Sequence, residues 1–304
     1  MRISTSTSYA VGTYDMQSLQ VGLNKLQMQL DTQKRVVTPA DDPVASARIL
    51  QISQSNDANT QYIANTKQVE SNLSLAESQV SNASNLLTSL KAAAIQAGNT
   101  VLDAKQLQMI QKQVQSGITE MLGYANATDG KGNYLFSGSK TSTAPFVLDS
   151  TYQASYQGDT EQRNVPISAS RSMQISDPGS SIFGDSSSQT AAFDALKKLN
   201  DLLAQDPKPA TYSTQMGTII SSLDTAQKNM ATLEASIGAR RQENQNVQDV
   251  GGTMALQYKS AISSLQDLDL PSAISDFTQT QTALKYSQLT YSKVTSLSLF
   301  NYMS

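Results

Sequence analysis

The 304-residue chain contains no cysteine, no histidine and no tryptophan. Without cysteine it can form neither a disulfide nor a thiolate metal site, and it has no thiol nucleophile. Without histidine it lacks the side chain that titrates near neutral pH and the commonest metal ligand. Its carboxylates are scattered, and no histidine is present to activate its many serine and threonine hydroxyls. We therefore expect no enzyme, no cofactor and no metal site.

Charged residues are also scarce, at 15% of the chain against about 25% in an average soluble protein. The net charge of −3 offers no basic surface that could neutralise phosphates, so we expect no nucleic-acid partner. No apolar run reaches the roughly 18 residues that a membrane span needs. The first nine residues carry one positive charge and no apolar segment, which argues against a Sec-type signal peptide. We expect a protein that is cytoplasmic or exported by another route.

Helical periodicity is the strongest positive signal. Apolar residues recur at steps of three and four in five segments, which is the spacing of one helix face. The segments are 16–30, 69–101, 107–121, 216–268 and 274–294. Asp103 is placed to cap the third helix, and Asp129-Gly130 to end it. In the fourth, thirteen of sixteen seam positions are apolar; at the exceptions Arg240, Asn244 and Gly251 we expect the seam to reach solvent, although buried polar positions that fix register are the alternative.

Between residues 131 and 189 the pattern changes to short apolar runs separated by turn residues, which is typical of β-strands. The runs are Tyr134–Phe136, Phe146–Leu148, Val165–Ile167 and Met173–Ile175. We therefore predict a mainly α fold, an elongated helical bundle or coiled-coil rod built from the N- and C-terminal segments, with a small β-rich domain inserted mid-chain. The predicted divisions are paired terminal helices (1–42 and 271–304), a helical rod (43–130 and 190–270) and the β-rich insertion (131–189).

Self-association is the function that this composition favours. The helix seams are apolar, and uncharged polar residues crowd the other faces, so these faces can pack against other subunits without desolvating charge. The terminal segments each carry an apolar stripe, and we expect them to be disordered or loosely paired until they assemble. A monomeric helical bundle with an unusual surface is the alternative. The candidate interface residues are Leu19, Leu23, Leu26, Leu30, Phe277, Leu284, Tyr291, Leu297, Leu299 and Phe300.

The joint after the first helix adds four charged candidates. Asp41 and Asp42 precede Pro43, and an Asp N-cap followed by proline is typical of a helix start. Lys34 and Arg35 lie at the end of the preceding helix, where cations complement the helix dipole. We expect these four residues to set the joint between inner and outer layers of an assembly.

Three segments resemble the bacterial flagellin superfamily, and within it the hook–filament junction proteins. Residues 29–45 resemble the family's LSTGKRV-x-PSDDP-x-A segment, with Gln33 where the family usually has glycine. Residues 127–146 resemble the stretch N-x-T-D-G-x-G-x-Y-x-F-(A/S)-G with its following APF, and residues 296–300 include the terminal LSLF. The segments occur in the family's order along the whole chain.

The resemblance implies a structural subunit at the junction between hook and filament, built by head-to-tail self-association, with paired terminal helices forming an inner tube. It implies copies of the chain itself, the hook-side junction protein and flagellin as partners, and an export chaperone on the C-terminal segment. It further implies export by the flagellar type III apparatus, without a cleaved signal peptide, to the extracellular flagellum. A small filament flagellin is the alternative within this class, and a type III-secreted adhesin or effector is the alternative outside it.

Overall fold

The computed structural model describes the backbone of residues 5–99, 102–206 and 208–303, and the side chains of residues 7, 9–99, 102–206 and 208–294. The chain forms two compact units. Unit 1 combines Met1–Ala58 with Thr253–Ser304, and unit 2 is Asn59–Gly252. Seven helices and four short strands are assigned in the described chain, which confirms a mainly α fold with a small β-rich insertion. No described helix is long and apolar enough to cross a membrane.

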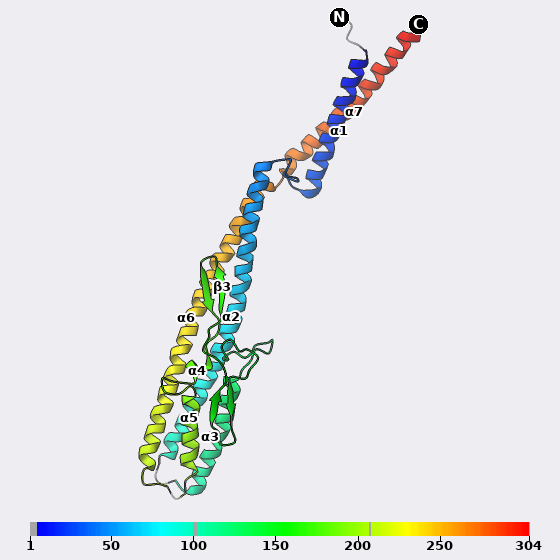
Figure 1. The fold of residues 1–304 in the computed structure, drawn as a ribbon. Helices are drawn as coiled ribbons and strands as arrows, with labels where there is room; N and C mark the ends of the chain where they lie inside the picture. Colours follow the sequence, from blue (N-terminus) through cyan, green and yellow to red (C-terminus); the bar gives the residue numbers. More distant parts are fainter. Residues whose placement is uncertain (1–4, 100–101, 207, 304) are drawn as a thin grey trace. The chain divides into compact units, whose positions relative to one another are not determined.

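Unit 1 is dominated by two long terminal helices that lie side by side (Figure 1). They are α1 (Thr5–Thr32) and α7 (Leu270–Met303). The unit also contains the first turns of α2 (Pro43–Ala97) and the last turns of α6 (Tyr212–Gln266). Side-chain periodicity explains the pairing, because each terminal helix places residues at steps of three and four on the face that meets the other.

Unit 2 is a helical bundle in which α2 and α6 run antiparallel. Arg241 of α6 is paired with Glu70 and Glu77 of α2, and Lys91 of α2 with Asp224 of α6. Two shorter helices, α3 (Ala104–Ala125) and α5 (Ala191–Leu203), complete the bundle. The sequence did not single out α5.

Helix α3 begins as predicted. Asp103 accepts a hydrogen bond from the Gln106 amide at 2.7 Å, and the Gln106 side chain accepts one from the Asp103 amide, which is a capping box. The predicted end at Asp129 is wrong, because the helix stops at Ala125. Asn126 then turns the chain by exchanging two side-chain hydrogen bonds with the backbone of Phe146.

The prediction that the α6 seam reaches solvent at Arg240, Asn244 and Gly251 is also wrong. Asn244 is 0% exposed, Gly251 is buried, and Arg240 is paired with the buried Asp177. Asn244 donates to the carbonyl oxygen of Thr66, and Arg240 reaches the insertion. Each polar residue therefore has a partner across the seam or in the insertion, which is why it can stay inside.

The insertion consists of two antiparallel hairpins and a short helix. β1 (Phe146–Leu148) pairs with β2 (Ala154–Tyr156), and β3 (Asn164–Ser168) pairs with β4 (Arg171–Gln174). They are followed by the single turn α4 (Gly179–Ile182). Three of the predicted runs contribute to strands, but Tyr134–Phe136 does not. Tyr134 forms only an isolated bridge with Thr128, and the amides of Tyr134 and Leu135 donate to the carbonyl oxygens of Thr141 and Ala127.

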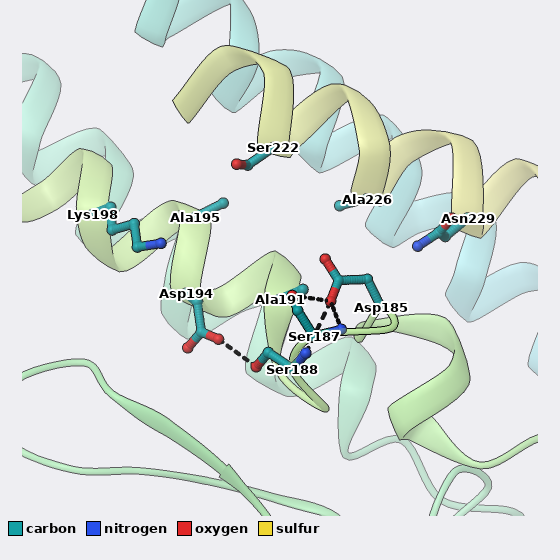
Figure 2. A pocket seen from close by; sticks show the side chains of 10 residues that line it. All are labelled: Asp185, Ser187, Ser188, Ala191, Asp194, Ala195, Lys198, Ser222, Ala226 and Asn229. Carbon is teal, nitrogen blue, oxygen red and sulfur yellow. Dashed lines mark hydrogen bonds between the residues drawn. The ribbon is translucent and has the colours of Figure 1, made fainter. Parts of the chain in front are cut away.

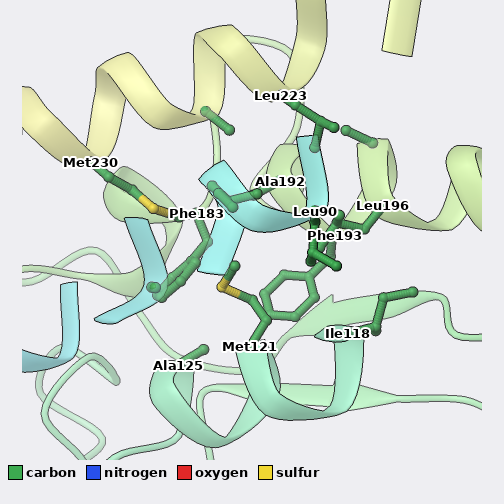
Figure 3. Packing of buried hydrophobic residues seen from close by; sticks show 14 of the residues in the cluster. Leu90, Ile118, Met121, Ala125, Phe183, Ala192, Phe193, Leu196, Leu223 and Met230 are labelled. Atoms are coloured by element: carbon green, nitrogen blue, oxygen red, sulfur yellow. The ribbon is translucent and has the colours of Figure 1, made fainter. Parts of the chain in front are cut away.

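An aromatic cluster fixes the insertion on the bundle. Phe146 lies 5.2 Å from Phe193 of α5 and 5.3 Å from Phe183 between ring centroids. Figure 3 shows Phe193 beside Met121 of α3, with Leu90 of α2 close by. Arg240 of α6 donates to the carbonyl oxygen of Gln174 in β4 at 3.3 Å and pairs at 2.6 Å with Asp177, which follows this strand. Buried aromatic area and this ion pair together position the strands.

Candidate assembly surfaces

The joint after α1 begins with a residue in a conformation that favours glycine. Gln33 has φ +55°, directly after α1 ends at Thr32. The Lys34 amide donates back to the carbonyl oxygen of Gln29 at 3.2 Å, which is the hydrogen bonding of a left-handed helix cap. The carbonyl oxygen of Gln33 accepts from the Leu268 amide at 3.1 Å. The tight turn of the family segment is therefore present although glycine is not.

Arg35 closes the joint from the other side. Its amide donates to the carbonyl oxygen of Gln266 at 2.7 Å, and its guanidinium donates to that of Leu265 at 2.7 Å. These are carbonyls at the C-terminal end of α6, where helix carbonyls lack intrahelical partners. The prediction that Arg35 serves the end of the first helix is therefore wrong. Lys34 has an exposed side chain and takes part through its backbone, in a bridge with Asp267.

The two aspartates organise the rest of the joint. Asp42 accepts from the Ala45 amide at 2.9 Å, which confirms the predicted cap of α2, and it also pairs with Arg35. Asp41 pairs with Lys25 of α1 at 2.8 Å and accepts from the Thr38 amide. The Lys25 ammonium and the Thr38 amide hold the pKa of Asp41 far below its usual value. The Ala45 amide and Arg35 lower the pKa of Asp42. Both aspartates therefore stay ionised well into the acid range.

The predicted apolar stripe packs α1 against α7. Tyr9 lies 6.1 Å from Tyr291 between ring centroids, and a Cβ on Gly12 would lie 3.0 Å from the Tyr291 ring. Because residues seven apart share a helix face, Leu19 and Leu26 lie on the face of Gly12. We call the predicted residues at this contact the inner stripe. Leu284 is buried, and the half-buried members are Leu19, Leu23, Leu26, Leu30, Phe277 and Tyr291. Leu297, Leu299 and Phe300 belong to α7, but their side chains lie outside the described residues.

A second apolar stripe, which sequence analysis missed, lies on the opposite face of α1. We call Val11, Tyr14, Val21 and Met28 the outer stripe. These side chains are 54%, 72%, 68% and 50% exposed. Tyr14, Val21 and Met28 stand two positions after Gly12, Leu19 and Leu26, which share the face toward α7, and two positions rotate a helix by about 200°. Their spacing of three, seven and seven was the signal that could have revealed them.

Exposed apolar side chains are concentrated in unit 1 as a whole. Among the described side chains, 13 of the 18 large hydrophobic residues that are exposed belong to unit 1. Only 4 of the 42 buried hydrophobic residues do, namely Val36, Ala45, Ala273 and Leu284. Unit 2 therefore has a core of its own, whereas the described part of unit 1 leaves much of its apolar surface in water.

Unit 2 contains a small polar cavity. It has a volume of about 130 Å³ and lies between α5 and α6 (Figure 2). Asp185 accepts from the amides of Ser187 and Ser188, and Asp194 accepts from the Ser188 hydroxyl. These bonds shape the turn before α5. The Ser187 hydroxyl, together with the amides of Ser187 and Ser188, lowers the pKa of Asp185. Among the described residues no cluster of three or more acidic side chains could hold a metal ion.

Comparison with known proteins defines the class of this fold. The family model described as the bacterial flagellin N-terminal helical region matches residues 3–141. The chain is 30% identical over 316 residues to flagellar hook-associated protein 3 of Escherichia coli strain K12, covering 99% of both chains. It is 28% identical over 321 residues to the protein of the same name from Salmonella typhimurium, again covering 99% of both. The chain belongs to the flagellar hook-associated protein 3 family, whose members are structural proteins of the bacterial flagellum.

Solved structures agree on the fold. A putative flagellar hook-associated protein from Vibrio parahaemolyticus aligns with a TM-score of 0.69 at 20% identity, covering 75% of this chain and all of that one. The flagellar junction protein FlgL from Legionella pneumophila aligns with a TM-score of 0.60 at 18% identity, covering 72% of this chain and all of that one. At these identities the likeness establishes the fold alone.

Proposed function

We propose that this chain is a non-enzymatic subunit of the junction between flagellar hook and filament, and that neighbouring copies cover its terminal unit. The names of its relatives, hook-associated protein and junction protein, support the position in the flagellum. They favour a junction subunit over a small filament flagellin and over a secreted adhesin or effector.

The observation that carries the proposal is the outer stripe. Its four side chains are half to three-quarters exposed, and full burial of such a side chain contributes roughly 1.5–3 kcal/mol. Covering the stripe would therefore contribute about 3–8 kcal/mol per subunit, before the cost of ordering the contact. The seven-residue spacing of Tyr14, Val21 and Met28 is the pattern that a second helix packs against. We assign that helix to a neighbouring copy.

This arrangement gives the candidate interface residues a role within the subunit and adds the outer stripe as a contact between subunits. The inner stripe, which includes Leu19, Leu26 and Leu284, holds α1 to α7, and the outer stripe makes the contact between subunits. Arg35, Asp41 and Asp42 set the geometry of the joint at the base of the pair. The hook-side junction protein would meet one end of the assembled subunits and flagellin the other, because head-to-tail interfaces join two different surfaces.

The terminal pair would become fully ordered only on incorporation, because its described residues bury just Ala273 and Leu284 among apolar side chains of α1 and α7. We expect weak amide protection over residues 10–30 in the free chain. Strong protection there would contradict this part of the proposal. Export through the flagellar type III apparatus, with a chaperone on the C-terminal segment, is consistent with such a terminus.

The test is a charge placed on the outer stripe. The double variant Tyr14→Lys/Val21→Lys should keep the melting temperature of the free protein within a few degrees, because both side chains are exposed. In a deletion strain it should fail to restore swimming, and flagellin should accumulate in the medium. The matched control is Met109→Lys/Val147→Lys, which introduces the same charges at exposed apolar positions of unit 2. Normal swimming of the strain that carries the outer-stripe variant would refute the proposal.

A further inference from the structure

The seam between α2 and α6 in unit 2 is built from levels seven residues apart. Two hydrogen bonds fix which residues face each other, from Asn59 to Gly251 and from Asn244 to Thr66. Stepping by seven along both helices gives the other levels, all of them apolar and almost fully buried. They are Leu73 with Ile237, Val80 with Met230, Leu87 with Leu223, and Ala94 with Met216.

Two levels at one end of this seam are polar instead. Asn244 is 0% exposed, and its Nδ2 donates to the carbonyl oxygen of Thr66 at 2.9 Å. Its Oδ1 is buried and has no hydrogen-bond partner in the described part of the chain. One level further, Nδ2 of Asn59 donates to the carbonyl oxygen of Gly251 at 2.8 Å. We call residues 59–66 and 244–251 the polar segment.

Opening the polar segment is less costly than opening the rest of the seam. Separating an apolar level exposes two aliphatic side chains to water, which the hydrophobic effect opposes. Separating a polar level gives water to buried amide groups, including the Asn244 oxygen that lacks a partner when the seam is closed. The apolar contribution in this segment comes from Tyr62, Ile63 and Val247, and each of these side chains is only half-buried. Local opening of a structure concentrates where buried apolar contacts are few.

The ion pairs between α2 and α6 all lie outside the polar segment. Arg241 joins Glu70 and Glu77, and Lys91 joins Asp224, all on the apolar side of the Asn244 level. The boundary of unit 2 falls at Asn59 and Gly252, immediately beside the outer polar level. The apolar part of the bundle, which the ion pairs hold together, therefore lies next to the polar segment but does not include it.

We propose that the polar segment is a built-in opening site, at which α2 and α6 separate and close again while the apolar levels stay together. The amide bonds make the closing specific. A seam of apolar levels alone could close one heptad out of register, whereas Asn244 meets the Thr66 carbonyl at one register only. The segment therefore gives this end of the bundle freedom to rearrange without losing its register. This inference concerns the bundle alone and does not depend on the proposed junction role.

Amide hydrogen exchange on the full chain tests the proposal. Residues 244–251 and 59–66 should exchange at least tenfold faster than residues 80–90 and 219–230. Asn244→Leu, which turns one polar level into an apolar one, should slow exchange in the polar segment by about tenfold. Equal protection of the two regions in the wild-type protein would overturn the proposal, and so would a folded Asn244→Leu protein with unchanged exchange.

A second variant keeps the test decisive if leucine does not fit. Asn244→Asp is nearly the same size and places a carboxylate at the same level, so it should accelerate exchange in the polar segment and leave residues 80–90 unchanged. As a matched control, Ile237→Asn should create a new opening site around residues 70–76 and 234–240. Acceleration spread evenly over the bundle in Asn244→Asp would contradict a local opening site.

Discussion

Replacement of Gln33 by glycine should stabilise the joint between α1 and α2. Gln33 holds φ +55°, and its two neighbouring hydrogen bonds connect α1 to itself and to the segment after α6. A side chain in the left-handed region is crowded against the backbone, so glycine adopts this conformation at lower free energy. The change Gln33→Gly removes the crowding and leaves the hydrogen bonds in place.

The expected gain follows from two opposing contributions. The left-handed conformation costs a non-glycine residue roughly 1–2 kcal/mol. Glycine loses more conformational freedom on folding, which costs roughly 0.5–1 kcal/mol. The net stabilisation of the joint is therefore about 0.5–1 kcal/mol, which corresponds to a roughly twofold to fivefold change in an opening equilibrium. Gln33→Val should act in the opposite direction, because β-branched residues tolerate positive φ poorly.

The assay is hydrogen exchange of the amides that the turn protects. The amides of Lys34 and Leu268 donate across the joint, to Gln29 and Gln33. Their protection should rise about threefold in Gln33→Gly and fall in Gln33→Val. Gln27→Gly is the matched control. It makes the same replacement inside α1, where glycine disfavours the helix, so it should lower the protection of the Lys34 amide. If Gln33→Gly lowered the protection of both amides, the conformational argument would be refuted.

Two further predictions concern acid and packing. Lys25 and the Thr38 amide depress the pKa of Asp41, and a depressed carboxyl pKa contributes stability that is present above the unfolded value and lost as the pH falls toward the folded one. The Thr38 amide should therefore keep constant protection from pH 8 to 5 and lose it below about pH 4; loss of protection near pH 6 would contradict this. In the bundle, a Cβ on Gly117 would lie 2.6 Å from a methyl of Leu90, which is 1% exposed. Gly117→Ala should lower the free energy of unfolding by about 1–3 kcal/mol in chemical denaturation, whereas Gly123→Ala, where a Cβ would meet nothing, should not.

Local interactions made part of the structure predictable. Asp103 and Asp42 were recognised as caps because a side-chain oxygen bonds an amide two or three residues away, which the local sequence contains in full. The long helices were recognised because their apolar spacing repeats over many turns. The strand Ala154–Tyr156 was missed because Ala-Ser-Tyr is not an apolar run and the strand depends on its partner Phe146–Leu148.

Partners far apart in sequence were not predictable. Arg35 is placed to serve the helix before it, yet it donates to Leu265, 230 residues away. The sequence predicts that the seam reaches solvent at Asn244, but the side-chain amide of Asn244 is buried and donates to the carbonyl oxygen of Thr66. In each case the polar group is stabilised by a backbone group that only folding brings near.

The sequence by itself determined the mainly α class, the start of α2 at Pro43, the absence of histidine and cysteine chemistry, and the presence of apolar stripes on the terminal segments. Only the tertiary structure decided which stripe of α1 is covered by α7 and which is left in water. The physical reason is that periodicity reports the angle between two faces of a helix, whereas the position of the partner helix decides which of those faces is buried.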